Sequence, residues 1–307
     1  MGWRVASAEK MQEIIDDKRI IFGKDETTTP SLKLYLHENE KEPPYTVFYQ
    51  PIKSATQRLD KLLSSKVFQH PKDENVLIRL IEACTDPNNN DMILDFFAGS
   101  GTTAHAVMLA NAKQQTQRRF ILVQLPEPCA EKSEAYQAGY KTIAEICKER
   151  LRRAGRKIQE ENPHQSLDVG FRVFKLDSSN IKPWDPTFET LEEDLIAHVD
   201  NIKHDRSSDD LLFELLLKYG LDLSLPIETH VLAGKKVYVL GGGALMVCLD
   251  KDVSMQTIEG IGQLKETLSP DIIRVVFRDH CFENDVIKTN ALLTLKQRYA
   301  ITDIKSL

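Results

Sequence analysis

The chain has 307 residues and a net charge of −6, and 41% of its residues are hydrophobic. This length accommodates about two domains, and the composition is that of an ordinary folded protein. No apolar run approaches the ~20 residues that span a bilayer, and residues 1–30 show no signal peptide. We therefore expect no membrane association.

The five cysteines are widely spaced and include no C-x-x-C pair. An odd number without such pairs argues against both a disulfide framework and a zinc site. We expect reduced, mostly buried cysteines, no bound metal, and a cytoplasmic location.

The charges are distributed unevenly. Residues 1–160 carry 24 Lys and Arg against 22 Asp and Glu, whereas residues 161–307 carry 16 against 24. A phosphate backbone is bound by Lys and Arg, so the acidic part is a better candidate for protein contacts than for DNA contacts.

Secondary structure in the first part of the chain follows from periodicity and turn residues. The stretch before residue 45 is polar and mostly irregular, with a short helix expected over 8–17, and further helices are predicted over 54–65 and 73–85. The apolar run 91–98 predicts a buried strand. After it we expect a glycine turn at 99–101, a helix over 102–115, a second strand over 118–125 and one long helix over 133–160. Strand, helix, strand, helix is the order that builds a parallel sheet.

The stretch 161–170 is expected to be a linker that separates the first part of the chain from a second part. Its expected elements are a strand over 170–176, a Trp-Pro turn, acidic helices over 188–202 and 207–219, a hairpin over 230–250, a strand over 271–279 and a helix over 283–299. The domain boundaries that follow are 1–162 and 168–307, with an α/β fold in each.

The glycine turn carries the most specific chemistry in the chain. Gly99 and Gly101 follow a strand and open a helix, where glycines let backbone N–H groups approach a ligand closely. The free N–H groups of a helix start favour an anion, and ligands of open α/β sheets bind at the carboxyl ends of the strands. Three interpretations stay open: a structural turn without ligand, a nicotinamide or flavin site, and an S-adenosylmethionine site. A P-loop is excluded because no G-K-[ST] follows.

S-adenosylmethionine fits the residues best. Its ammonium group suits Asp95, its carboxylate suits the helix start at Thr102 and Thr103, and its ribose would reach 124–127. A dinucleotide has no obvious use for the charge of Asp95.

The stretch "DFFAGSGTTAHAV" resembles the cofactor motif of β-class adenine-N6 DNA methyltransferases, and above all that of the Mod subunits of type III restriction–modification systems. "VFQHPKDENVLIRLI", "RFILVQLPE", "GYKTIAEICKERLRRAGRKI" and "FKLDSSNIKPWD" resemble further Mod segments, so the likeness covers nearly the whole chain. It implies a Rossmann-like methyltransferase core, here incomplete, followed by a small carboxyl-terminal α/β domain for subunit interaction. The predicted cofactor-binding residues are Phe68, His70, Pro71, Lys72, Asp95, Phe96, Phe97, Ala98, Gly99, Ser100, Gly101, Thr102, Thr103, Gln124 and Glu127.

The tetrapeptide Glu42, Pro43, Pro44 and Tyr45 resembles the family's catalytic D/N/S-P-P-Y/F loop. In the β-class order this loop precedes the target-recognition region, but only 49 residues separate Tyr45 from Asp95. Glutamate is also one methylene longer than the family's residues. We therefore interpret this stretch as a proline turn and assign no catalytic residue.

The resemblance implies the modification subunit of a type III system, with this chain supplying the S-adenosylmethionine-binding half and inactive alone. Expected partners are DNA, the restriction subunit, and either a second Mod copy or a separate amino-terminal half. The alternatives are a non-catalytic subunit-interaction module and an NAD(P)-dependent oxidoreductase.

Other chemistry-bearing residues have structural explanations. His105 is expected to pack on its helix. The basic helix end with Arg150, Arg152, Arg153, Arg156 and Lys157 is either a solvated face or a DNA-phosphate contact. The glycines 241–243 predict a hairpin turn.

Overall fold

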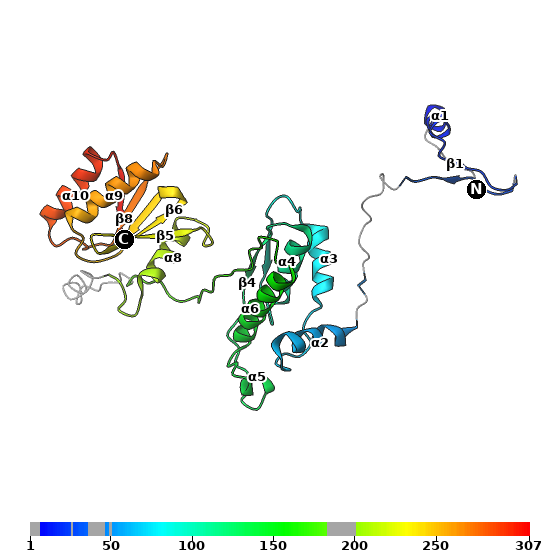
Figure 1. Ribbon diagram of the computed structural model, residues 1–307, viewed down its shortest axis with the longest axis horizontal. Coiled ribbons are helices and arrows are strands. Elements are labelled where there is room, and N and C mark those ends of the chain that lie inside the picture. The colour runs from blue at the N-terminus through cyan, green and yellow to red at the C-terminus, as the bar shows by residue number, and fades with distance from the viewer. Residues whose placement is uncertain (1–6, 26, 36–46, 49–50, 183–200) are drawn as a thin grey trace, which may run out of the picture. The chain divides into compact units, whose positions relative to one another are not determined.

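The computed structural model describes residues 7–25, 27–35, 47–48, 51–182 and 201–307 (Figure 1). The chain divides into two compact units, Met1–Phe171 and Arg172–Leu307. Both combine helices with sheets, so the fold is α/β, as expected. None of the helices in the described ranges is long and apolar enough to cross a membrane.

The first described element is the short helix α1 (Ala8–Asp16), which confirms the helix predicted there. The Ser7 side chain begins it by accepting a hydrogen bond from the backbone N–H of Lys10, a typical N-cap. The strands β1 (Ile20–Ile21) and β2 (Ser31–Leu32) then pair in antiparallel orientation.

The central layer of the first unit is a parallel pair of strands, β3 (Met92–Asp95) and β4 (Arg119–Leu122). Helix α4 (Thr102–Gln114) connects them and packs between α3 (Glu74–Cys84) and α6 (Ile143–Glu161) (Figure 1). Eight of the thirteen residues of α4 are buried, and several of them, such as Ala104, Ala106 and Ala110, are small. Small side chains bring neighbouring helices close to α4 on both sides, which places the start of α4 inside the unit.

A buried amide holds the link between α4 and β4. Asn111 donates from Nδ2 to the carbonyl oxygen of Arg118 at 2.8 Å and accepts from the Arg118 N–H at 3.1 Å. Arg118 in turn donates from Nε to Thr85 Oγ1 at 2.7 Å. The end of α3, the end of α4 and the start of β4 are thereby joined by hydrogen bonds.

The helix predicted as continuous over 133–160 is broken near its start. The structure has a short helix α5 (Glu134–Gln137), a break at Gly139 with φ of +96°, and then α6. Thr142 and Glu145 form a reciprocal capping box that starts α6, a motif that satisfies two backbone donors at a helix start. Helix α2 (Ile52–Leu63) packs against α6.

The buried strand predicted over 91–98 exists as β3, but it is buried on one face only. Ile93 and Phe120 face α3 and α4, whereas Met92 and Leu94 on the opposite face are 45% and 48% exposed. The helices of the described part of the unit therefore cover one side of this sheet.

The second unit contains a five-stranded sheet in the order β5-β6-β7-β8-β9. Its first three strands are antiparallel and its last three parallel. The strands are β5 (Ile227–Leu232), β6 (Lys235–Leu240), β7 (Leu245–Cys248), β8 (Arg274–Phe277) and β9 (Asp303–Ser306).

Both faces of this sheet are buried. Val237, Val239 and Met246 pack with α9 (Met255–Leu268) and α10 (Asp285–Gln297) on one face. The alternate residues Tyr238 and Leu240 pack with α8 (Ser208–Lys218) on the other face. The second unit is therefore a three-layer α/β domain with a core on each side of its sheet.

Several predictions for the second unit are confirmed. Helix α8 lies within the acidic helix predicted over 207–219, and β5, β6 and the glycine turn at Gly241–Gly243 form the predicted hairpins. The strand over 271–279 and the helix over 283–299 are present as β8 and α10. The Trp-Pro turn and nearly all of the helix over 188–202 lie outside the described residues.

Two predictions for this unit are wrong. Residues 170–176 form no strand; Val173 and Leu176 are 55% and 98% exposed, and no described segment pairs with them. Helix α9, capped by Ser254, and strand β9 were not predicted at all.

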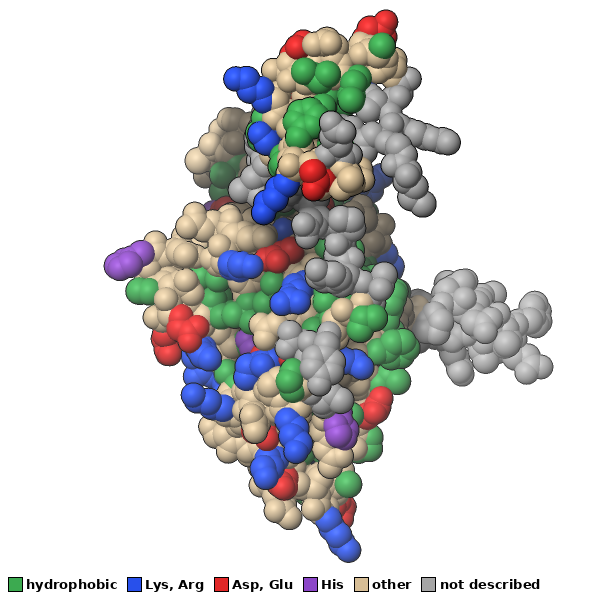
Figure 2. All heavy atoms as spheres, turned by 90° about the vertical axis from the view of Figure 1, so that its right-hand side faces the viewer, with side chains coloured by type: hydrophobic (Ala, Val, Ile, Leu, Met, Phe, Trp, Pro, Cys, Tyr) green, Lys and Arg blue, Asp and Glu red, His purple; other side chains and the backbone are tan. Residues whose placement is uncertain are grey.

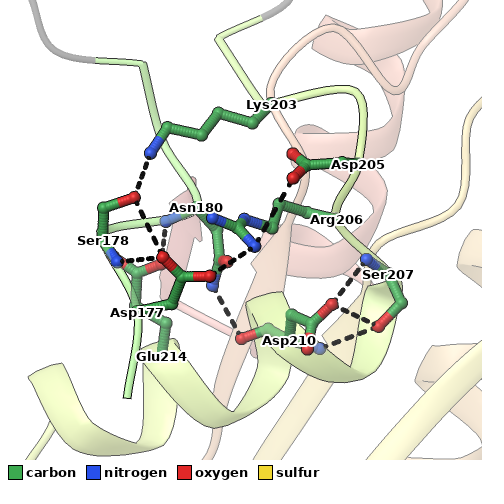
Figure 3. A network of polar contacts seen from close by, with 9 residues as sticks. All are labelled: Asp177, Ser178, Asn180, Lys203, Asp205, Arg206, Ser207, Asp210 and Glu214. Atoms are coloured by element: carbon green, nitrogen blue, oxygen red, sulfur yellow. Dashed lines mark hydrogen bonds and ion pairs between the residues drawn. The ribbon is translucent and has the colours of Figure 1, made fainter. Parts of the chain in front are cut away.

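A network of polar contacts joins the residues on either side of segment 183–200 (Figure 3). The backbones meet in an antiparallel bridge, in which Lys182 N–H donates to Asn201 at 2.7 Å and Lys203 N–H donates to Asn180 at 2.9 Å. Glu214 on α8 accepts from the Asn180 N–H at 2.7 Å. Both ends of the segment are thus held at one place beside α8.

Candidate functional site

The glycine turn lies at the carboxyl end of β3. Gly99 and Gly101 have φ of +52° and +78°, a backbone conformation that side chains other than glycine rarely adopt. The turn reverses the chain so that α4 begins at Thr102. A sharp strand-to-helix turn at the carboxyl end of a parallel sheet is the position at which ligands of such sheets bind.

Gly101 is also required for packing beneath the turn. A Cβ atom at this position would lie 2.6 Å from Leu151 Cδ1 and 2.8 Å from Cys147 Sγ. The start of α4 therefore rests directly on α6. Gly101 carries no capping side chain, so the first N–H groups of α4 depend on a ligand or on water for partners.

Asp95 ends β3 and is oriented by two groups of the same turn. Its Oδ1 accepts from the Phe97 N–H at 3.0 Å and its Oδ2 accepts from Thr103 Oγ1 at 2.5 Å. A carboxylate offers about four lone pairs, so both oxygens keep capacity for a further donor such as an ammonium group. Asp95 and Thr103, predicted together as ligand residues, are indeed neighbours.

Gln124, which follows β4, reaches the same turn. Its Oε1 accepts from the Gly99 N–H at 2.7 Å. The Gly99 N–H, one of the backbone donors expected to face an anion, is therefore already bonded to a side chain. Through this hydrogen bond Gln124 links the end of β4 to the turn that follows β3. Glu127 is exposed, and its carbonyl oxygen accepts from the Ile143 N–H at 2.9 Å.

The segment before α3 lies next to the turn, as predicted. The Phe68 ring is 3.5 Å from the position that a Cβ atom on Gly99 would take. Pro71 is buried, whereas His70 and Lys72 are exposed. Of the two phenylalanines after Asp95, Phe96 is 65% and Phe97 is 88% exposed.

A buried arginine, which the sequence analysis did not assign to the site, supports the turn from below. Arg150 on α6 is 1% exposed and donates from Nη1 to Ser100 Oγ and to Thr102 Oγ1, both at 2.8 Å. Burial lowers its pKa to about 10, so it is charged at neutral pH. The DNA-phosphate contact considered for Arg150 is wrong, because its guanidinium lies inside the unit.

The charge of Arg150 is balanced by a buried acid. Glu74, at the start of α3, has Oε2 at 3.8 Å from Arg150 Nη2 and accepts from Arg58 Nε at 2.5 Å. Burial acts to raise the pKa of Glu74, but the hydrogen bond from Arg58, a backbone hydrogen bond and the charge of Arg58 together outweigh it, and the pKa lies below its usual value. Glu74 thus forms ion pairs with both Arg58 and Arg150, and these pairs join α2, α3 and α6 beneath the turn.

His105 belongs to the same group. Arg150 Nε donates toward His105 Nδ1 at 3.4 Å, which requires an unprotonated Nδ1. Burial, and next the charge of Arg150, lower the pKa of His105 to about 4. His105 thus packs against Arg150, as expected for a packed helix residue, and its low pKa makes the ring a weak base.

The remaining basic residues of α6 lie on its outer side. Arg152 and Arg153 form ion pairs with Glu149, and Lys157 with Glu161. These ion pairs partly neutralise the charges of α6, as is usual on a solvated surface. Figure 2 shows Lys and Arg side chains scattered among hydrophobic ones over the face in view.

Glu42, Pro43, Pro44 and Tyr45 lie outside the described residues. A hollow of about 400 Å³ is lined by Asn75, Ile78, Arg79, Glu82 and Lys113, none of which is a predicted cofactor residue. At the turn itself, the side chains of Phe96 and Phe97 are largely exposed.

Sequence comparisons show which known proteins the chain resembles. Residues 5–152 match a family model described as a DNA methylase. The Mod subunit of the type III restriction-modification enzyme EcoP15I from Escherichia coli is 33% identical over 80% of this chain. The StyLTI Mod subunit from Salmonella typhimurium is 34% identical over 59% of the chain. The chain is a relative of the type III Mod subunits.

A third relative lies outside the type III enzymes. The type II methyltransferase M.KpnI from Klebsiella pneumoniae is 39% identical over 32% of the chain. The matches cover 36%, 27% and 23% of the EcoP15I, StyLTI and M.KpnI proteins respectively. The chain therefore spans about a quarter to a third of the length of these relatives.

Proposed function

We propose that this chain is the S-adenosylmethionine-binding part of an adenine-N6 DNA methyltransferase, the modification subunit of a type III restriction–modification system. The observation that carries the proposal is the glycine turn after β3, with Asp95 oriented beside Thr103, in a chain related to Mod subunits. A methylase needs a methyl donor. At this turn, the carboxylate of Asp95 and the first N–H groups of α4 would bind such a donor.

The fold supports the same proposal. The order β3, α4, β4, α6 is the start of a Rossmann-like core, for which we propose residues 1–162. We propose that residues 168–307 form the Mod-type carboxyl-terminal domain, which contacts other subunits through its acidic surface. The chain divides after Phe171, so residues 168–171, proposed as the start of the second domain, belong to the first unit.

The residues at the turn fit the two ends of S-adenosylmethionine. Asp95 would accept from its ammonium group, and the first N–H groups of α4 at Thr102 and Thr103 would donate to its carboxylate. Phe68 would pack beside the turn, where its ring meets Gly99. The remaining predicted contacts are His70, Pro71, Lys72, Phe96, Phe97, Ala98, Ser100, Gln124 and Glu127.

When bound, this cofactor supplies an activated methyl group on sulfur. The protein would contribute orientation and electrostatics: the carboxylate of Asp95 would hold the ammonium end, and the start of α4 would hold the carboxylate end. Arg150 contributes indirectly, because its hydrogen bonds to Ser100 and Thr102 hold the turn in shape.

Adenine methylation also needs the base turned out of the duplex, stacked and hydrogen-bonded along its Watson–Crick edge. None of the described residues forms such a base pocket. We therefore propose that the chain transfers no methyl group by itself. Its partners would be DNA, the restriction subunit, and a second Mod copy or a separate amino-terminal half. A cytoplasmic location remains a prediction.

Calorimetry with S-adenosylmethionine and with NAD tests the proposal. We expect the chain to bind S-adenosylmethionine and not NAD, and Asp95→Ala to weaken binding at least about tenfold, because a charge-assisted hydrogen bond is worth ~1.5–3 kcal/mol. Asp91→Ala, just before the other end of β3, is the matched control and should bind normally. Binding of NAD without binding of S-adenosylmethionine would favour the oxidoreductase alternative and end the proposal.

A further inference from the structure

Three backbone donors of the glycine turn are bonded within the chain. The Ala98 N–H donates to the Val123 carbonyl oxygen at 3.1 Å, and the Gly101 N–H donates to the Ala98 carbonyl oxygen at 2.7 Å. The Gly99 N–H donates to Gln124 Oε1 at 2.7 Å. The turn therefore uses these donors, at positions 98, 99 and 101, to hold its own shape.

This bonding differs from what a dinucleotide site requires. Residues Gly99 to Ala104 fit the G-x-G-x-x-G/A fingerprint, in which the second glycine lets the backbone approach a pyrophosphate. Here the second glycine is Gly101, and its open side faces α6, since a Cβ atom there would lie 2.6 Å from Leu151 Cδ1. Gly101 therefore serves the packing of α4 on α6 rather than the approach of a ligand.

The fingerprint thus follows from the shape of the turn. Gly99 has a φ of +52°, and Gly101 has a φ of +78° and lies against α6. Glycines required for these two reasons reproduce the spacing of a dinucleotide site without its binding chemistry.

The Gly99 donor differs from the other two because its partner is a side chain. An N–H needs an acceptor, so the amide of Gln124 directs its oxygen and not its nitrogen to Gly99. The nitrogen donates to the Leu125 carbonyl oxygen at 3.1 Å, which fixes the plane of the amide. The backbone before Gln124 is also held beside the turn, since the Val123 N–H donates to the Asp95 carbonyl oxygen at 2.8 Å.

An amide oxygen at this place acts against a phosphate in two ways. It occupies the Gly99 N–H, and it brings a partial negative charge to the turn. A pyrophosphate needs several backbone N–H groups together, whereas a carboxylate carries a single charge that the first N–H groups of α4 can bind.

We infer that Gln124 is a specificity-determining residue, which excludes diphosphate ligands from the glycine turn and leaves the start of α4 to a carboxylate. Specificity of this kind comes from an element that disfavours the wrong ligand as well as from contacts to the right one. The inference rests on the proposed function, because it names the class of ligand that the same site rejects.

The experiment compares ADP-ribose with adenosine by calorimetry on the full chain. ADP-ribose carries the diphosphate of nicotinamide and flavin dinucleotides, whereas adenosine is the same nucleoside without phosphate. We expect Gln124→Ala to bind ADP-ribose at least about tenfold more tightly than the unmodified chain does. The freed Gly99 N–H would then form a charge-assisted hydrogen bond with a phosphate, a bond roughly twice as strong as a neutral one. The affinity for adenosine should not rise.

Two further variants at Gln124 separate the hydrogen bond from the space that the side chain fills. Gln124→Glu keeps an acceptor for the Gly99 N–H and adds a charge, so it should exclude ADP-ribose as the unmodified chain does. Gln124→Met fills a similar volume without an acceptor, so it should gain affinity, and it replaces the alanine variant if alanine disturbs the fold. Hydrogen exchange in α4 shows whether each variant keeps its fold.

The matched control is Gln159→Ala, at an exposed position of α6, which should change neither affinity. The inference is overturned if the unmodified chain binds ADP-ribose as tightly as Gln124→Ala does. It is also overturned by a gain in Gln124→Glu, by an equal gain for adenosine, or by no gain in the alanine and methionine variants.

Binding of S-adenosylmethionine, measured on the same preparations, separates the inference from the proposed function. If the unmodified chain binds S-adenosylmethionine but the variants gain no affinity for ADP-ribose, the inference fails and the function stands. If the variants gain affinity for ADP-ribose but the unmodified chain does not bind S-adenosylmethionine, the function fails and the exclusion of diphosphates stands.

Discussion

Arg150 and Ser100 are joined by a hydrogen bond of 2.8 Å between the guanidinium Nη1 and the hydroxyl oxygen, across 50 residues of sequence. The contact lies inside the first unit, where Arg150 is 1% exposed. It connects the long helix α6 to the loop that the cofactor is proposed to bind. The shape of that loop therefore depends on a charge buried inside the unit.

Replacement of Arg150 by methionine should destabilise the first unit by about 2–3 kcal/mol. The change leaves the hydroxyls of Ser100 and Thr102 and one oxygen of Glu74 without their buried partner, and unsatisfied buried groups cost about this much. The loss is measured by urea denaturation followed by hydrogen exchange in α4 and α6. Arg152→Met, on the exposed side of α6, is the control, and an equal effect of both variants would contradict the supporting role.

Replacement of Gly101 by alanine should cost more than the same change at Gly139. Both have positive φ, which costs ~1–2 kcal/mol with a side chain. Only at Gly101 does the new Cβ atom meet Leu151 Cδ1, at 2.6 Å, and overpacking adds ~1–3 kcal/mol. A Cβ atom on Gly139 meets nothing within 4 Å. Equal losses of unfolding free energy in the two variants would show that the contact with α6 is unimportant.

The stability of the first unit should fall as the pH drops from 6.5 to 4. Burial lowers the pKa of His105 in the folded chain to about 4, so below pH 6.5 the unfolded chain takes up a proton that the folded chain does not. The contribution is complete above pH 6.5 and is lost as the pH falls through this window. His105→Gln should flatten the pH dependence, measured by hydrogen exchange in α4. The exposed His164→Gln should leave it unchanged; a flat profile in the unmodified chain would contradict the prediction.

Glu214 should make the second unit sensitive to acid. Although burial acts to raise its pKa, hydrogen bonds from Ser179 Oγ, Asn180 N–H and Lys218 Nζ lower it to about 2. For a carboxyl whose folded pKa is depressed, the stabilisation is present above the unfolded value of about 4.5 and disappears as the pH falls toward 2. Glu214→Gln should therefore destabilise α8 at pH 7 and have little effect near pH 2. Glu266→Gln on the exposed side of α9 serves as the control.

The order of elements around the glycine turn was predictable because it rests on local patterns. The apolar run before Gly99, the glycine spacing and the helical spacing after Thr102 are all short-range signals. The capping box of Thr142 and Glu145 is an equally local signal for the start of α6 at Ile143. The helix predicted over 133–160 does not take it into account and therefore begins too early. Helix α9 was missed although Ser254 and the apolar spacing of Ile258 and Ile261 indicate it.

Local sequence patterns do not show which strands pair with each other or which faces of a strand are buried. The remaining errors are of these two kinds. Residues 170–176 have strand-forming side chains, but a strand exists only where a second strand pairs with it. The exposed face of β3, which carries Met92 and Leu94, was not predictable either. The continuous apolar run of this segment is typical of a strand that is buried on both faces. Arg150 is an intermediate case: it lies four residues from both Ile146 and Ala154, on the apolar side of α6, so its position on that stripe indicates burial.

The antiparallel bridge between Ile181 and Ile202 has a consequence for how related sequences can differ in size. Backbone contacts and α8 hold the two sides of the bridge together. The five-stranded sheet therefore does not depend on the number of residues that connect them. The entropic cost of a longer connection grows only slowly with its length. Insertions and deletions among homologues of the second unit should therefore accumulate between positions 182 and 201, where they alter contour length without moving any strand.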